Sequence, residues 1–126
     1  MRVQKAILWL MIASPLHAQE ALNETAARAW YSGVTVGGTT ADGQTFRAYH
    51  SPDGKVRALV AEQHGNEGPW SVKADGSVCV NWRDWSWGKH PCYWIKPDGD
   101  NWKLERVDDS KNVTRVKRLE GNVYNM

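Results

Sequence analysis

Four Asp-Gly dipeptides punctuate this sequence, at residues 42–43, 53–54, 75–76 and 98–99. Each lies between short runs rich in Val, Thr, Phe, Tyr or Trp, the residue types that favour β-strands. Asp-Gly suits tight turns, because Gly tolerates a positive φ and Asp hydrogen-bonds to its own backbone. The chain is therefore predicted to be mainly β, with antiparallel strands joined by turns.

Eight short strands are predicted between and around these turns. They span residues 34–40, 44–50, 55–62, 69–74, 77–82, 91–96, 101–107 and 113–120. Consecutive short strands favour a single antiparallel meander, and closing it would remove exposed edges. We expect residues 19–126 to form one domain, a small barrel or curled sheet of about eight strands. The pair Gly37–Gly38 is expected to allow a bend or bulge in the first strand.

An N-terminal helix is predicted over residues 19–33, ahead of the first strand. Ala26, Ala29 and Trp30 recur there at helical spacing, and Gly33 can end the helix. Such a helix would cover one open end of the barrel.

Residues 1–18 have the layout of a secretory signal peptide. Arg2 and Lys5 precede an apolar run over residues 6–14, and Ala18 supplies the small residue that a signal peptidase needs. The run is shorter than the roughly 20 residues that span a bilayer. We expect no stable membrane span after cleavage, although an uncleaved anchor is the alternative.

The charge of the chain argues against nucleic acid as a partner. The formal net charge is +2, and Arg2 and Lys5 account for that excess. Without them, 14 basic residues balance 14 acidic ones. A basic footprint, which general nucleic-acid binders need, is therefore missing.

The two cysteines, Cys79 and Cys92, are expected to form one disulfide, as is common in short exported chains. If they face each other in an antiparallel hairpin, the two residue numbers of every facing pair add up to 171. Val78 then faces Tyr93 and Val80 faces Pro91, while Asn81 meets His90 and Trp82 meets Lys89. This register places mostly apolar residues on one face and mostly polar residues on the other, as a half-buried hairpin requires.

The tip of this hairpin is the candidate binding surface. Sixteen residues, 79–94, hold four of the eight tryptophans of the chain. Trp85 and Trp87 lie in the predicted connecting loop, and we expect them to bind a partner together with Arg83 and His90. Trp and Arg are enriched in binding hot spots. The alternative is that the loop folds back and both indoles cap the open end of the barrel.

No catalytic, metal or cofactor site is predicted. His50, His64 and His90 do not follow a known metal-ligand spacing, and the segment around His64 is typical of a turn. No serine-nucleophile motif is present. The alternative is a small metal-dependent or hydrolytic enzyme that uses these histidines with carboxylates such as Glu62.

Short motifs follow one another in a fixed order along nearly the whole of residues 19–126. They are a Gly-rich first strand, an aromatic strand before Pro-Asp-Gly, a Gly-x-Trp-x-Val strand, and a hairpin that ends in Pro-Cys-Tyr. The residues concerned are Gly38, Phe46, Tyr49, Gly54, Gly68, Trp70, Val72, Cys79, Trp82, Cys92, Tyr93, Gly121 and Asn122. The chain resembles in this a group of small exported proteobacterial proteins of unknown function. The resemblance implies a periplasmic, disulfide-bonded β-domain and brings no catalytic residues.

A second, looser likeness is to small secreted β-barrel inhibitors of bacterial proteases. They share the Gly-x-Trp-x-apolar strand, the following Cys hairpin and the Pro-Asp-Gly turn. Their inhibitory N-terminal segment would correspond to residues 19–33, which are predicted to be helical here.

We therefore predict a non-catalytic, monomeric binding protein, periplasmic or secreted by a bacterium, that uses the aromatic hairpin tip. Its expected partner is an envelope protein or a glycan, with no cofactor. The alternatives are an inhibitor of a secreted protease or lysozyme and the small enzyme described above.

Overall fold

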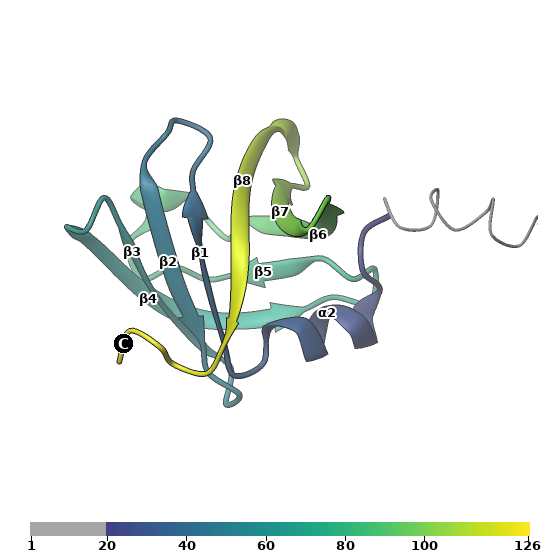
Figure 1. Cartoon of the computed structure of the whole chain (residues 1–126), viewed down its shortest axis with the longest axis horizontal. Helices are drawn as coiled ribbons and strands as arrows, with labels where there is room; N and C mark the ends of the chain where they lie inside the picture. Colours follow the sequence, from purple (N-terminus) through teal and green to yellow (C-terminus); the bar gives the residue numbers. More distant parts are fainter. Residues whose placement is uncertain (1–19) are drawn as a thin grey trace, which may run out of the picture.

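The computed structural model describes residues 20–126, whose eight strands form a closed antiparallel barrel (Figure 1). Each strand pairs with the next, and the last pairs with the first. The strands are β1 (Val34–Thr39), β2 (Thr45–His50), β3 (Lys55–Val60), β4 (His64–Val72), β5 (Val78–Val80), β6 (Cys92–Asp98), β7 (Asn101–Arg106) and β8 (Asp109–Glu120). The predicted fold class is confirmed. The predicted signal peptide, residues 1–18, lies outside the described residues.

The Asp-Gly dipeptides form turns, as predicted. In the turn between β1 and β2, Gly43 has a φ of 88°, and in the next turn Gly54 has a φ of 95°. The amide of Gly54 donates to the carbonyl of Ser51, which closes that turn. A residue with a side chain rarely adopts such φ values, so these dipeptides place the turns along the chain.

The helix α2 (Glu24–Tyr31) lies across one end of the barrel (Figure 1). It is shorter than the predicted 19–33, because Asn23 caps it and accepts a hydrogen bond from the amide of Ala26 at 2.9 Å. Leu22, the residue before the cap, lies beside β6, where its amide donates a hydrogen bond to the carbonyl of Ile95. Trp30 and Tyr31 of the helix are buried and close this end of the barrel.

Alternate residues of each strand point into the barrel, as the twofold repeat of a β-strand requires. In β2, Ala48 and His50 are buried, whereas Thr45 is exposed. The interior is built mainly from aliphatic side chains, with Val34, Val36 and Ile95 fully buried. The buried residues Ala27, Trp30 and Tyr31 of α2 belong to the same core.

A disulfide joins Cys79 of β5 to Cys92 of β6, as predicted. The predicted register holds around it: Val78 pairs with Tyr93, and the amide of Val80 donates to the carbonyl of Pro91 at 3.0 Å.

Beyond Val80, however, the predicted pairs of Asn81 with His90 and of Trp82 with Lys89 are wrong. The strand β5 ends at Val80, and β6 begins only at Cys92. The chain instead stays beside β4, where the amide of Asn81 donates to the carbonyl of Pro69 at 3.0 Å. The loop between β5 and β6 is therefore longer than predicted.

The Gly37–Gly38 pair does not form the expected bulge. The pairing of β1 with β2 and with β8 runs without a register shift through both residues. Gly38 is instead a point of close approach, because a β-carbon there would overlap the carbonyl of Arg115 in β8. The glycine lets the last strand close tightly against the first.

Candidate functional site

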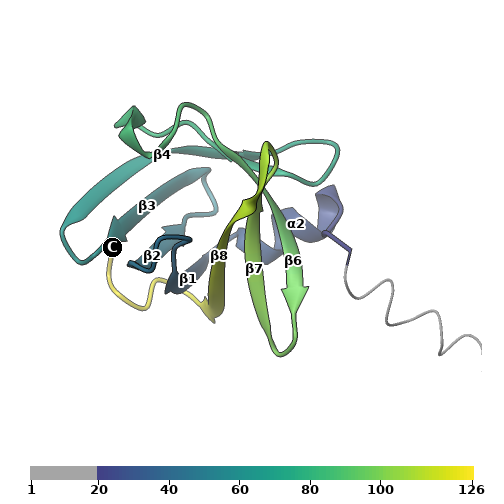
Figure 2. The ribbon, with the colours of Figure 1, turned by 90° about the horizontal axis from the view of Figure 1, so that it is seen from above.

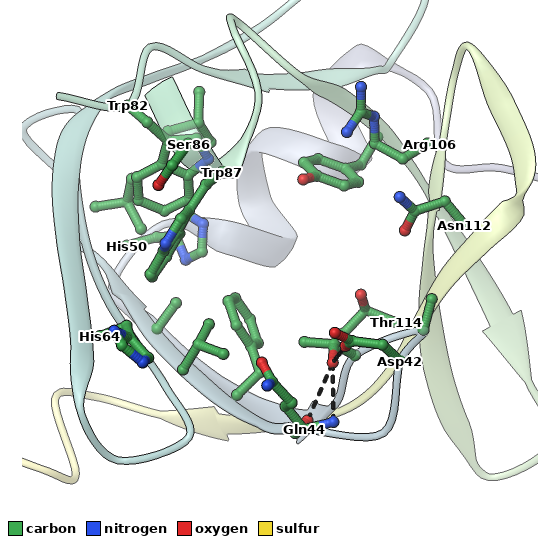
Figure 3. Close-up of a pocket in the computed structure, with 18 residues that line it drawn as sticks. Asp42, Gln44, His50, His64, Trp82, Ser86, Trp87, Arg106, Asn112 and Thr114 are labelled. Atoms are coloured by element: carbon green, nitrogen blue, oxygen red, sulfur yellow. Dashed lines mark hydrogen bonds between the residues drawn. The ribbon is translucent and has the colours of Figure 1, made fainter. Parts of the chain in front are cut away.

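A cavity of about 460 Å³ opens at one end of the barrel (Figure 3). The helix α2 lies at the other end, which is the far end of the barrel when it is seen from above (Figure 2). The interior of the cavity is mostly aromatic and aliphatic, formed by Phe46, Ala48, His50, Val56, Val60, Val80, Trp82, Trp87 and Tyr93. Its rim is mostly polar, formed by Thr40, Ala41, Asp42, Gln44, His64, Ser86, Arg106, Asn112 and Thr114. An apolar interior under a polar rim is the usual form of a small-molecule site.

The depth of the cavity follows from the inward-facing residues of β2. Phe46 lies near the mouth, Ala48 lies halfway, and His50 lies at the end next to α2. His50 lies four positions after Phe46 in the strand, which is about 13 Å at roughly 3.3 Å per residue. On the neighbouring strand, Val60 pairs with Phe46 and Val56 pairs with His50. The cavity thus reaches from the open rim to a floor formed by His50 and Val56.

Two sides of the opening differ in chemistry (Figure 3). Trp82, Trp87 and His50 lie on one side, and the Trp82 and Trp87 rings pack edge to face with centroids 4.9 Å apart. Arg106 and Asn112 lie on the opposite side, where Arg106 lies beside the ring of Tyr93. A bound molecule would therefore meet two indoles on one side and polar groups beside a phenol ring on the other.

Arg106 is the basic residue that lines this cavity. Its guanidinium makes two hydrogen bonds of 3.1 Å with Asp108, and it lies 5.9 Å from the ring centre of Tyr93. Burial raises the pKa of Tyr93 above its ordinary value, so this phenol stays protonated at neutral pH. The pair with Asp108 compensates much of the positive charge of Arg106 at the rim.

His50 forms the floor of the cavity and is 3% exposed. Its imidazole stacks on Tyr31, with centroids 3.8 Å apart, and meets Trp70 edge to face at 5.6 Å. Burial lowers the pKa of His50 to about 3, so the ring is neutral at physiological pH. Its Nδ1 is buried without a hydrogen-bond partner. Sequence reasoning did not single out this role, because a histidine at a strand end has no distinctive spacing.

The structure separates the two tryptophans of the predicted tip. They belong to a short 3-10 helix, η1 (Trp85–Trp87), which Asp84 caps. Trp87 points to the cavity and packs on Trp82, whereas Trp85 is 54% exposed on the outside. Neither predicted alternative holds for both rings: the Trp87 indole lines the cavity and the Trp85 indole faces solvent.

Arg83 and His90, the other two residues of the predicted surface, stay on the outside near Trp85. Arg83 is exposed and forms an ion pair with Glu67 at 3.0 Å. His90 lies 5.9 Å from Trp85 between ring centroids, and Lys89 places its ammonium 4.8 Å from the Trp85 ring centre. These residues form a small external patch, separate from the cavity that Trp87 lines.

Asn66 holds the loop that carries both tryptophans, a role that no sequence pattern indicates. Its side chain is buried, donates to the carbonyl of Asp84 at 2.9 Å and accepts from the amide of Asp84 at 3.0 Å. Asn66 is an inward-facing residue of β4, a strand that begins at His64, where the sequence had suggested a turn. Because β4 begins at His64 and not at the predicted residue 69, the side-chain amide of Asn66 lies next to the loop that carries Trp85 and Trp87.

Among residues 20–126, no cluster of three or more His, Cys, Asp and Glu side chains is arranged to hold a metal ion. Over the same range, no helix has the length and apolar character to cross a membrane.

No protein-family model and no curated protein matches the chain. The resemblance to small exported proteobacterial proteins therefore stays a prediction. The functional argument depends on the geometry of the cavity and of the hairpin.

Proposed function

We propose that this protein is a non-catalytic binding protein that takes up a small apolar molecule through the open end of its barrel. The observation that carries the proposal is the cavity of about 460 Å³, with its aromatic and aliphatic interior and polar rim. A cavity of roughly 150 Å³ is enough to hold benzene, so a molecule of one or two rings fits here. Eight-stranded barrels are wide enough to hold one small ligand.

The proposed compartment is the periplasm or the exterior of a bacterial cell. The Cys79–Cys92 disulfide supports this, because such bridges persist in oxidising compartments. The signal-like composition of residues 1–18 supports it too. We propose a monomer, since each barrel has its own cavity.

His50 favours binding over acid–base catalysis in this cavity. With a pKa of about 3, its imidazole is a weak base at neutral pH, far from the value near 7 that suits a general base.

The exposed Trp85 supports a second, external contact with an envelope protein or a glycan. Its ring is 54% exposed and lies beside Lys89 and His90, and Trp85 shares a shallow outer pocket with Arg83. An indole held next to cationic groups is typical of binding hot spots. This patch is the part of the predicted hairpin tip that remains outside the cavity.

Two neighbouring residues of β3 allow a matched test of the cavity as the binding site. Val60 lines the cavity, whereas Leu59 points to the outer surface. Val60→Trp should fill the mouth, and Leu59→Trp adds the same ring outside. We expect N-phenyl-1-naphthylamine, a neutral apolar dye, to fluoresce on binding to the wild type and to Leu59→Trp.

Val60→Trp should weaken dye binding by roughly tenfold or more, which is about 1.4 kcal/mol. Unfolding of all three proteins in urea checks that the fold is kept. Equal dye affinity in the two variants, or no binding to the wild type, would show that the cavity is not the site.

A further inference from the structure

Three buried side-chain nitrogens lack a hydrogen-bond partner among the described residues: Trp30 Nε1, Arg47 Nε and His50 Nδ1. Of these three residues, His50 is the one that lines the cavity. Buried polar atoms are nearly always satisfied, because a buried donor or acceptor that makes no hydrogen bond has lost its hydration without compensation. Nδ1 itself is closed off by its neighbours, so the place where an occupant can supply a missing partner is the other ring nitrogen, Nε2, for which no hydrogen bond is found among the described residues either.

The floor around His50 carries no formal charge. Ala48 and Val56 flank it within the cavity, and Tyr31 stacks on its ring. The formally charged residues that line the cavity, Asp42 and Arg106, belong to the rim. A charged group that reached the floor would lose its hydration without meeting an opposite charge, which costs far more than burying a neutral polar group.

The wall above the floor is suited to a flat ring. Trp82 and Trp87 pack together on the side of the cavity where His50 lies (Figure 3). Phe46 and Tyr93 also line the interior. Aromatic rings pack well against one another with centroids about 4.5–7 Å apart.

We propose that the occupant is a neutral, ring-containing alcohol or phenol whose hydroxyl group reaches Nε2 of His50 while its ring lies against Trp82 and Trp87. This deepens the proposed function and rests on it. A hydroxyl both donates and accepts, so it satisfies Nε2 in either neutral tautomer of the imidazole. A carboxylate accepts only and brings a charge to the uncharged floor.

Three probes of the same shape test this on the wild-type protein by calorimetry: 2-naphthol, 2-methylnaphthalene and 2-naphthoate. Transfer from water favours 2-methylnaphthalene, because a methyl group is less well hydrated than a hydroxyl. We expect 2-naphthol nevertheless to bind about tenfold more tightly than 2-methylnaphthalene. We expect 2-naphthoate to bind most weakly.

The outcomes separate the two proposals. If 2-methylnaphthalene binds as tightly as 2-naphthol, the cavity binds apolar rings but the hydroxyl inference is wrong. If 2-naphthoate binds most tightly, Arg106 at the rim decides the ligand and the inference is also wrong. If none of the three binds, the proposed function fails together with this inference.

A variant and a spectroscopic measurement locate the hydroxyl. His50→Phe keeps a ring against Tyr31 but removes both ring nitrogens, so it should weaken 2-naphthol about tenfold more than it weakens 2-methylnaphthalene; equal weakening of the two would overturn the inference. If the variant does not fold, the nitrogen-15 shift of His50 Nε2 in the wild type replaces it. That shift should change with 2-naphthol and stay constant with 2-methylnaphthalene; the same response to both would overturn the inference.

Discussion

The ring of Tyr31 stacks on the imidazole of His50, with centroids 3.8 Å apart and planes inclined by 37°. This contact joins α2, which closes one end of the barrel, to the floor of the cavity that opens at the other end. It also removes water from His50, and burial holds the pKa of this histidine at about 3. The helix therefore sets both the depth of the cavity and the neutrality of its floor.

We predict that the protein loses stability as the pH falls from 7 to 4.5. Unfolded His50 gains a proton below about pH 6.5, whereas folded His50 stays neutral until about pH 3. The unfolded state thus binds more protons, and the free energy of unfolding should drop by about 2.5 kcal/mol at pH 4.5. Urea unfolding followed by tryptophan fluorescence at the two pH values measures this change.

The control for this prediction is His50→Phe, in which that pH dependence should disappear. Hydrogen bonds from Ser51 and Ser77 lower the pKa of Asp53 and Asp75, respectively. Their stabilising contribution is present above the ordinary carboxyl pKa, near 4, and is lost only below it. An equal loss in the wild type and in His50→Phe between pH 7 and 4.5 would rule out His50 as its source.

Gly38→Ala should destabilise the barrel, and Gly37→Ala should not. A β-carbon at Gly38 would overlap the carbonyl of Arg115, whereas one at Gly37 would lie 3.7 Å from the carbonyl oxygen of Phe46, an ordinary contact. We expect Gly38→Ala to lower the free energy of unfolding by about 1–3 kcal/mol. Gly37→Ala should change it by less than about 1 kcal/mol. Chemical unfolding of both variants distinguishes close strand packing from a general need for glycine in β1.

Asn66→Ala should loosen the loop that carries Trp85 and Trp87. It removes both hydrogen bonds to the backbone of Asp84 and the one that the Asn66 side chain accepts from the amide of Glu67. We expect a loss of about 1–3 kcal/mol in unfolding free energy and weaker dye binding in the cavity. The exposed Asn81 serves as the control, because Asn81→Ala should alter stability by less than about 0.5 kcal/mol. Unchanged amide exchange in residues 83–91 would mean that other contacts hold the loop.

The two tryptophans of η1 should respond differently to truncation. Trp87 packs on Trp82, so Trp87→Ala should cost about 2 kcal/mol of stability. Trp85 is 54% exposed, and Trp85→Ala should cost less than about 0.5 kcal/mol. Quenching by acrylamide adds a second test: Trp85→Ala should remove the most accessible emission. Equal effects on both quantities would contradict the separation of the two rings.

Much of the local structure could be predicted because it depends on neighbouring residues. Asp-Gly turns act over four residues, and the strands between them have their own composition. The register around Cys79 and Cys92 was also predictable, since the bridge and the apolar alternation select the same pairs. Beyond Val80 the prediction failed, because Asn81 pairs with Pro69 of β4, a contact that alternation within the hairpin does not encode.

The candidate site was less predictable. Trp85 and Trp87 lie two residues apart in a 3-10 helix, where side chains do not alternate between two faces as they do in a strand. The directions of the two side chains depend on Asn66, which is distant along the chain. Asn66 belongs to β4 because this strand begins at His64, earlier than the predicted residue 69. His50 has no local mark of burial, because the helix that covers it is formed by residues 24–31.

By itself, the sequence determined the strands, the turns between them, the disulfide and the antiparallel class, since each depends on residues close together or on one covalent bond. The tertiary structure decided the closure of β1 on β8, the cavity and the neutral floor at His50. These features arise where segments far apart in the chain exclude water together, and burial of that kind is a property of the assembled barrel.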